Sequence, residues 1–173
     1  MITPAYCQTM ARYNAWQNQA IYVAADGLDD AAREADRGAF FGSIRATLSH
    51  LMWGDLVWLA RFDDGPVPPA VSSSAETAQA FDWPALMAQR PKLDARIAAW
   101  AWMLLPEDLD GDLTWTVRST GEVKTKTKAL CVMQFFNHQT HHRGQVHAML
   151  TAAGVKTTDT DLPYMPDEVP EWR

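Results

Sequence analysis

The chain has 173 residues, of which 47% are hydrophobic and 21% are charged, so it can bury one core and is not disordered by composition. Its formal net charge of −6 argues against a general nucleic-acid-binding protein, which needs a basic face to neutralise phosphates. With two scattered cysteines, no signal peptide and no apolar run long enough to span a membrane, we expect one cytoplasmic domain over residues 1–173, with no nucleic acid or membrane partner.

The first predicted helix covers residues 4–25. Pro4 suits a first helical turn because its missing N–H would have no partner there, and Gly27 offers an end. The second predicted helix covers residues 43–62, with Ser43 as its N-cap. It is followed by PVPPAVSSSAET, a loop by composition that begins directly after a glycine.

The third predicted helix covers residues 83–105. Asp82 is its candidate N-cap, Pro84 lies just inside it, and Pro106 follows its end. Pro91 lies within this range and predicts either a kink or a short separate first piece, because proline removes a helical hydrogen bond.

The pattern then changes to LTWTVRSTGEVKTKTKAL, which alternates and is rich in threonine and valine. This segment, centred on Ser-Thr-Gly, predicts a short β-hairpin. The fourth helix is expected over residues 127–153 with Gly154 as its end, and the proline-containing tail after residue 158 is expected to lie over the body without forming an element. Four long helices joined by loops predict an all-α four-helix bundle with a hairpin before the last helix.

The stretch FNHQTHHRGQVHAML in the last predicted helix holds four of the five histidines. With His138 at 0° on a helical wheel, His142 lies at about 40°, at the edge of the apolar stripe. His141 lies on the flank at about 300°, and His147 points away at about 180°. Imidazoles at positions i and i+4 can reach one ion, as in helical zinc sites. Gln139 stands where zinc proteases need a glutamate base, which disfavours peptide hydrolysis.

A third ligand is available only from His50, in the second predicted helix. That helix is apolar around most of its circumference, with Arg45 and Ser49 in a narrow polar sector, so His50 borders on or faces the bundle interior. Three histidines from two helices would leave positions open for water or substrate, which is typical of catalytic sites. The alternative is that these are ordinary surface or hydrogen-bonded core histidines.

The sequence resembles the DinB-like family of metalloproteins along nearly its whole length. The segments that carry the resemblance are YNAWQNQAIY, GSIRATLSHLMWGDLVWLARF, HQTHHRGQVHAML and TDLPYMP, in this order. The resemblance implies an up-down-down-up four-helix bundle. It also implies a divalent metal ion, zinc or nickel, held by His50, His138 and His142.

The same resemblance extends to metal-dependent thiol S-transferases, in which the ion holds a low-molecular-weight thiol as a nucleophile. It therefore implies an enzyme acting on a small-molecule substrate with a thiol, although it identifies neither the substrate nor the catalytic residues. Two alternatives stay open: a metal- or ligand-binding stress-response bundle without turnover, and a structural bundle with incidental histidines. A homodimer is compatible with the resemblance.

Asp55 falls within the apolar arc of the second helix, at about 140° from His50, which argues against direct ligation. We expect it to be a buried acid paired with a polar residue of the first helix, such as Asn14 or Arg12, rather than a carboxylate that orients the ligands or substrate. Cys131 lies on the histidine face but too far along the axis to share an ion, and is expected to be a small core residue.

Gln145 either lines the metal pocket or, as we expect, is a solvated glutamine at the helix edge. Arg143 and Gly144 are expected to serve packing or a contact with the tail. Most tryptophans are expected to fill the core, with one or two walling a ligand cavity. Those concerned are Trp53, Trp58, Trp100, Trp102 and Trp115.

Overall fold

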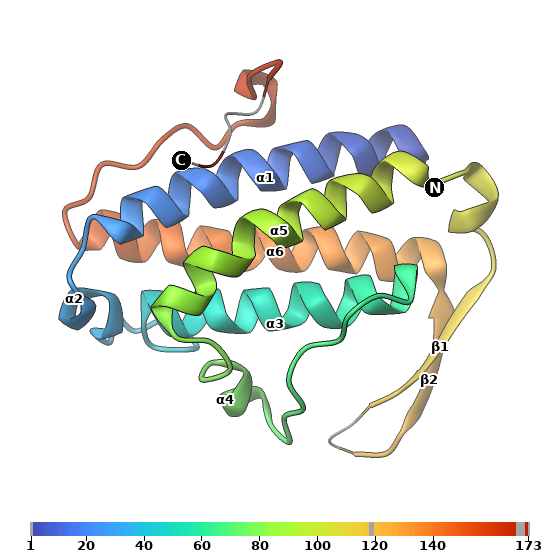
Figure 1. Ribbon diagram of the computed structural model, residues 1–173, viewed down its shortest axis with the longest axis horizontal. Coiled ribbons are helices and arrows are strands. Elements are labelled where there is room, and N and C mark those ends of the chain that lie inside the picture. Colours follow the sequence, from blue (N-terminus) through green and yellow to red (C-terminus); the bar gives the residue numbers. More distant parts are fainter. Residues whose placement is uncertain (1, 118–119, 169–171, 173) are drawn as a thin grey trace.

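Four long helices form the bundle in the computed structural model, which describes residues 2–117, 120–168 and 172. Helices α1 and α6 run in one direction and α3 and α5 in the other, so the expected up-down-down-up order is confirmed (Figure 1). Helix α1 packs mainly on α5, and α3 packs mainly on α6. Their bounds are Pro4–Asp26 for α1, Ile44–Asp63 for α3, Trp83–Met103 for α5 and Lys128–Ala152 for α6.

Side-chain caps define where three of the four long helices begin, namely α1, α3 and α5. The predicted caps Ser43 and Asp82 accept hydrogen bonds from backbone N–H groups of their first helical turns, at 3.2 and 2.9 Å. Thr3 caps α1 in the same way, at 3.2 Å. Such a cap stabilises a helix by about 1 kcal/mol, because it satisfies a backbone donor that has no partner within the helix.

Helix α5 continues through Pro91, so the prediction of a separate first piece is wrong. The bundle contacts along both sides of α5 outweigh the single backbone hydrogen bond that proline removes. The helix ends at Met103, slightly before the predicted end, and Pro106 opens the 3₁₀ turn η1 (Pro106–Leu109).

Two short helices were not predicted: α2 (Asp30–Glu34) and α4 (Ser74–Thr77), the second inside the predicted loop. Each follows a capping side chain, Asp29 for α2 and Ser73 for α4. Helices of this length contain too few residues to show a period of 3.6, so local capping is the only sequence signal for them.

The predicted β-hairpin is confirmed. Strands β1 (Asp112–Thr116) and β2 (Val123–Thr127) pair antiparallel, and Trp115 lies opposite Lys124. Residue 119, which belongs to the predicted centre of the turn, lies outside the described residues. Since β2 runs directly into α6, the hairpin extends from the start of that helix along the side of α3 on which α4 also lies (Figure 1).

The tail lies over α1, as expected, although it contains one 3₁₀ turn, η2 (Leu162–Tyr164), where no element was predicted. Three side chains of α1 hold it by donating hydrogen bonds to its backbone carbonyls. Arg12 bonds the carbonyls of residues 166 and 167, Tyr13 that of residue 160 and Gln17 that of residue 159.

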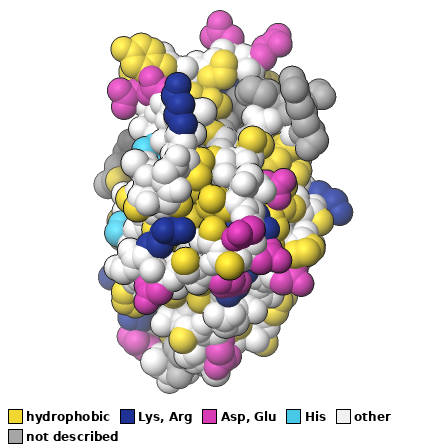
Figure 2. All heavy atoms as spheres, turned by 90° about the vertical axis from the view of Figure 1, so that its left-hand side faces the viewer, with side chains coloured by type: hydrophobic (Ala, Val, Ile, Leu, Met, Phe, Trp, Pro, Cys, Tyr) yellow, Lys and Arg dark blue, Asp and Glu magenta, His cyan; other side chains and the backbone are white. Residues whose placement is uncertain are grey.

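The surface carries charges of both signs. On the end of the bundle where α2 lies, lysine and arginine side chains are dispersed among aspartate and glutamate rather than gathered into a basic patch (Figure 2). Within the part of the chain that the structure describes, no helix has the length and hydrophobicity needed to cross a membrane.

Candidate metal site

The structure brings His50, His138 and His142 together where α3 packs against α6. His138 and His142 lie one turn apart on α6, and His50 faces them from α3. One nitrogen from each ring can be chosen so that all three lie within 4.8 Å of one another. This is the predicted set of residues, and it forms although His50 and His138 are 88 positions apart in the chain.

The nitrogens are spaced as metal ligands would be. The Nε2 atoms of His50 and His138 are 3.1 Å apart. Two imidazole nitrogens bound tetrahedrally to zinc at the usual bond lengths are about 3.3 Å apart, so this pair already has a suitable separation. The rings of His142 and His138 have centroids 4.5 Å apart, so the third imidazole lies beside the other two. Three imidazoles also suit zinc or nickel as a donor set.

Two hydrogen bonds fix which nitrogen of each ring is free. The hydroxyl of Thr77 donates to the carbonyl of Ser74 at 2.5 Å, so it accepts from Nδ1 of His50 at 2.7 Å. The side-chain oxygen of Gln145 accepts from Nδ1 of His142 at 2.8 Å. With hydrogen on Nδ1, both rings present an Nε2 lone pair to the site, which is how neighbouring residues commonly orient metal-binding histidines.

Gly54 sets the position of His138 by packing instead. A Cβ built on Gly54 would lie 2.8 Å from Cε1 of His138, closer than side chains pack, so only glycine leaves room for the ring. Among the described atoms, Nδ1 of His138 is buried and has no hydrogen-bond partner. Sequence reasoning missed Gly54. The available signal was an isolated glycine inside a predicted helix, one turn after His50.

Burial keeps the three imidazoles neutral. It lowers the pKa of His50 to about 3 and the pKa values of His138 and His142 to about 4, because a charged imidazolium loses its hydration there. The positive charges that the neighbouring histidines would carry lower these pKa values further. Neutral imidazole is the form that binds metal ions, so the site is ready for a cation at neutral pH.

Asp55 is a buried structural acid, as expected, but the expected partners are wrong. It accepts hydrogen bonds from Arg90 at 2.7 Å and from Gln139 at 2.9 Å. Asn14 donates to Gln139 instead, and Arg12 holds the tail. Arg90 is a stronger partner because its guanidinium is charged and equally buried, and a buried carboxylate needs a compensating charge.

The other residues of α6 singled out in the sequence lie in different surroundings. Gln145 is not the solvated glutamine we expected, since its hydrogen bond to His142 makes it part of the site. His141 is exposed and His147 lies outside the histidine group, as their helical angles predict. Cys131 is a buried core residue, as expected. Arg143 is buried, with its guanidinium 5.4 Å from the ring of Tyr13.

A cavity of about 290 Å³ adjoins the histidines at His50. Trp53, Trp58 and Trp115 line it, so three tryptophans wall a cavity where we expected one or two. Trp100 belongs to the core, whereas Trp102 is 74% exposed and is not the core residue we predicted. A polar helix face can carry one large side chain at little cost, which periodicity alone does not reveal.

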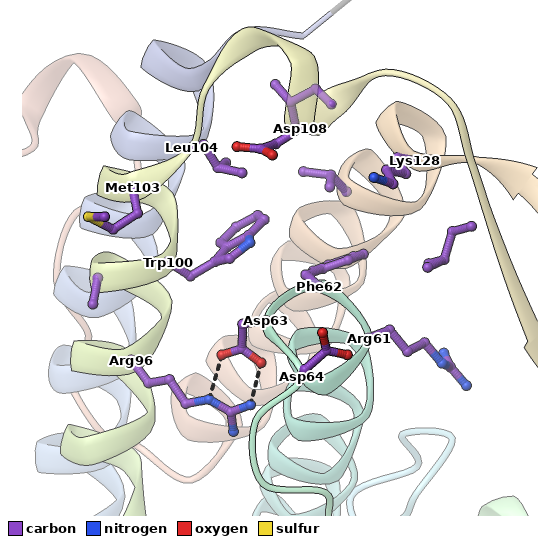
Figure 3. A pocket seen from close by; sticks show the side chains of 14 residues that line it. Arg61, Phe62, Asp63, Asp64, Arg96, Trp100, Met103, Leu104, Asp108 and Lys128 are labelled. Atoms are coloured by element: carbon purple, nitrogen blue, oxygen red, sulfur yellow. Dashed lines mark hydrogen bonds and ion pairs between the residues drawn. The ribbon is translucent and has the colours of Figure 1, made fainter.

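A larger cavity, of about 580 Å³, lies at the other end of α3, where α5 ends and α6 begins. Figure 3 shows its aromatic side chains Phe62 and Trp100 and the ion pair between Arg96 and Asp63, with distances of 2.6 and 2.8 Å. None of the three histidines is among its described lining residues, so size does not identify the metal site.

The fold and the site together place this protein in the class of up-down-down-up helical bundles with a candidate metal centre, formed by three histidines on two facing helices. The chain belongs to the DinB family, whose profile matches residues 1–173. It is similar to Protein DinB of Bacillus subtilis (strain 168), with 28% identity over 151 residues, which cover 86% of this chain and 87% of that protein. No solved structure matches the chain.

Proposed function

We propose that the protein binds one divalent metal ion, zinc or nickel, through His50, His138 and His142, and uses it in a thiol-dependent transfer reaction on a small molecule. The observation that carries the proposal is the convergence of three neutral imidazole nitrogens within 4.8 Å of one another. Three protein ligands leave a coordination position for a reactant, as in catalytic rather than structural sites.

The residues around the histidines support this use. When bound, such an ion lowers the pKa of a coordinated thiol or water and so supplies a nucleophile at neutral pH. Thr77 and Gln145 hold the lone pairs of two ligands toward the site. Phe41 stacks on the ring of His50, with centroids 4.0 Å apart, and keeps that ring in place. The cavity beside His50 offers room for a small-molecule substrate.

Metal content tests the proposal. We expect about one ion per chain in protein purified without a histidine tag, measured by plasma mass spectrometry. His138→Ala and His142→Ala should abolish tight binding, because each removes one of three ligands, and His50→Ala should weaken it strongly. The matched control is His147→Ala, on the same helix but outside the group, which should keep the full content. Full metal content in all three ligand variants would disprove the assignment.

A thiol titration separates an enzyme from a bundle that only binds metal. In the cobalt(II)-loaded protein, N-acetylcysteine should produce a thiolate-to-cobalt charge-transfer band that the His138→Ala variant lacks. If the ion binds and no thiol produces this band, the non-catalytic metal-binding protein that the sequence left open becomes the better account.

A further inference from the structure

The cavity beside His50 lies between one helix of the bundle and two segments outside the four-helix core. Helix α3 forms its floor, the crossover between α3 and α5 forms one side, and the hairpin forms another. Figure 1 shows the crossover and the hairpin on the same side of α3. The lining residues from these three parts include Val57 and Trp58 of α3, Val71 of the crossover, and Trp115 and Val117 of the hairpin.

Its walls are aromatic and carry a positive charge. The rings of Trp58 and Trp115 meet edge to face, with centroids 5.5 Å apart. The guanidinium of Arg61 lies over both rings, 4.6 Å from the centroid of Trp58 and 5.4 Å from that of Trp115. Among the described residues that line the cavity, none is acidic.

This arrangement selects the charge of a ligand. Tryptophan faces attract cations, but here Arg61 already lies over them. A cationic ligand would have to displace this guanidinium and would be repelled by it. An anionic group is attracted to Arg61, and a flat apolar body packs against tryptophan rings.

The size of the cavity limits the ligand as well. A volume of about 290 Å³ is at the lower end of the range of ligand pockets, which suits a molecule of one or two rings. His50 lies at one part of the lining, and Arg61 lies three turns further along α3. A ligand anchored at Arg61 therefore extends along the tryptophans toward the histidines.

We infer that this cavity binds small planar aromatic anions, with the ring against Trp58 and Trp115 and the anionic group at Arg61. The inference rests on the proposed function in one respect: it assigns the substrate class of that metal site. The binding itself depends on residues that are not metal ligands, so the two can fail separately.

Isothermal titration calorimetry of the full chain tests the inference with 2-naphthoate as probe. The protein should bind one equivalent both with and without added zinc, and Trp115→Leu should weaken binding by about tenfold or more, because it removes one aromatic wall. The matched control is Trp102→Leu, which changes an exposed tryptophan of α5 and should leave the affinity unchanged. Equal affinity of the wild type and Trp115→Leu would overturn the inference.

The role of the charge is tested with the cation 2-naphthylmethylammonium. The wild type should bind it at least about tenfold more weakly than 2-naphthoate, and Arg61→Gln should largely remove this preference. Cation binding as tight as anion binding in the wild type would contradict the inference. Arg61→Gln keeps both tryptophan walls of the cavity, so it remains informative if Trp115→Leu perturbs folding in a circular dichroism check.

The outcomes distinguish the two proposals. A wild-type chain that carries one ion and does not bind 2-naphthoate would overturn the aromatic-anion site and leave the metal site intact. A chain that binds 2-naphthoate with the expected charge preference, but takes up no metal, would support the cavity as a ligand site and disprove the proposed metal-dependent function.

Discussion

At the scale of single residues, the candidate site depends on neighbours that are not ligands. Thr77 and Gln145 orient two of the imidazoles through Nδ1, and Gly54 provides the space that the third ring fills. Hydrogen-bonding neighbours of metal ligands typically contribute 10- to 100-fold in metal affinity. Gly54 affects the position of the His138 ring in another way: it leaves the space that the ring occupies.

Gly54→Ala should weaken metal binding by about tenfold or more, because the new methyl group would displace the ring of His138. The affinity can be measured by competition with a chromophoric chelator. The matched control is Gly144→Ala on α6, where a Cβ meets nothing within 4 Å. That variant should keep its metal affinity and gain about 0.5–1 kcal/mol of stability, as alanine replaces glycine within a helix. Equal affinities in the two variants would contradict the role of Gly54.

At the scale of elements, the crossover between α3 and α5 is held in place by side chains of α3. The hydroxyl of Ser49 donates to the carbonyl of Thr77 at 2.7 Å and accepts from the N–H of Phe81 at 3.1 Å. Trp53 donates to the carbonyl of Pro69 at 2.9 Å, and Arg45 donates to crossover carbonyls nearby. The short helix α4 and its Thr77 are thereby fixed against His50.

Ser49→Ala should lower the free energy of unfolding by about 1–3 kcal/mol, because the buried N–H of Phe81 loses its acceptor and the carbonyl of Thr77 keeps only its bond from the N–H of Ala80. Metal affinity should fall as well, since Thr77 loses its anchor. Urea denaturation and chelator competition measure the two effects. Thr9→Ala, which removes an exposed hydroxyl from α1, is the control and should change both by little. A loss of stability with unchanged metal affinity would show that the crossover does not position His50.

At the scale of the whole molecule, a closed circuit of buried polar contacts joins the four helices. Asn14 of α1 donates to Gln139 of α6, which donates to Asp55 of α3. Arg90 of α5 then bridges the acids of α3 and α5, and the circuit returns to α1 through Asn18. Each of these hydrogen bonds and ion pairs forms only when its two helices are aligned in one way. The circuit therefore favours one register of the helices, and so one placement of the histidines.

The circuit predicts a pH dependence of stability. Burial raises the pKa of Asp94 to about 6, because the charged carboxylate loses its hydration there, and the charge of Asp55 raises it further, although Arg90 opposes the shift. The folded pKa therefore lies above the unfolded value, so the folded state holds a proton more tightly than the unfolded state. The stability that this proton contributes is fully present below about pH 4 and is lost as the pH rises through about 6.

Comparison with Asp94→Asn isolates this contribution, because asparagine does not titrate. The free energy of unfolding of the wild type, minus that of the variant, should fall as the pH rises from about 4 to about 7. Urea denaturation of the metal-free proteins at four pH values measures it, and the histidines cancel because both proteins contain them. A difference that rises over this range would contradict the raised pKa of Asp94.

The sequence by itself determined the four helices, the N-caps Ser43 and Asp82 and the pairing of His138 with His142. These features depend on residues within a turn or two of one another, so periodicity and capping are sufficient to read them. His50 followed because its helix has one narrow polar sector. Only the tertiary structure decided that Arg90 pairs with Asp55, that Thr77 orients His50 and that the hairpin closes a cavity. Those contacts join residues far apart in the chain, and their partners depend on how the helices pack, which no local pattern encodes.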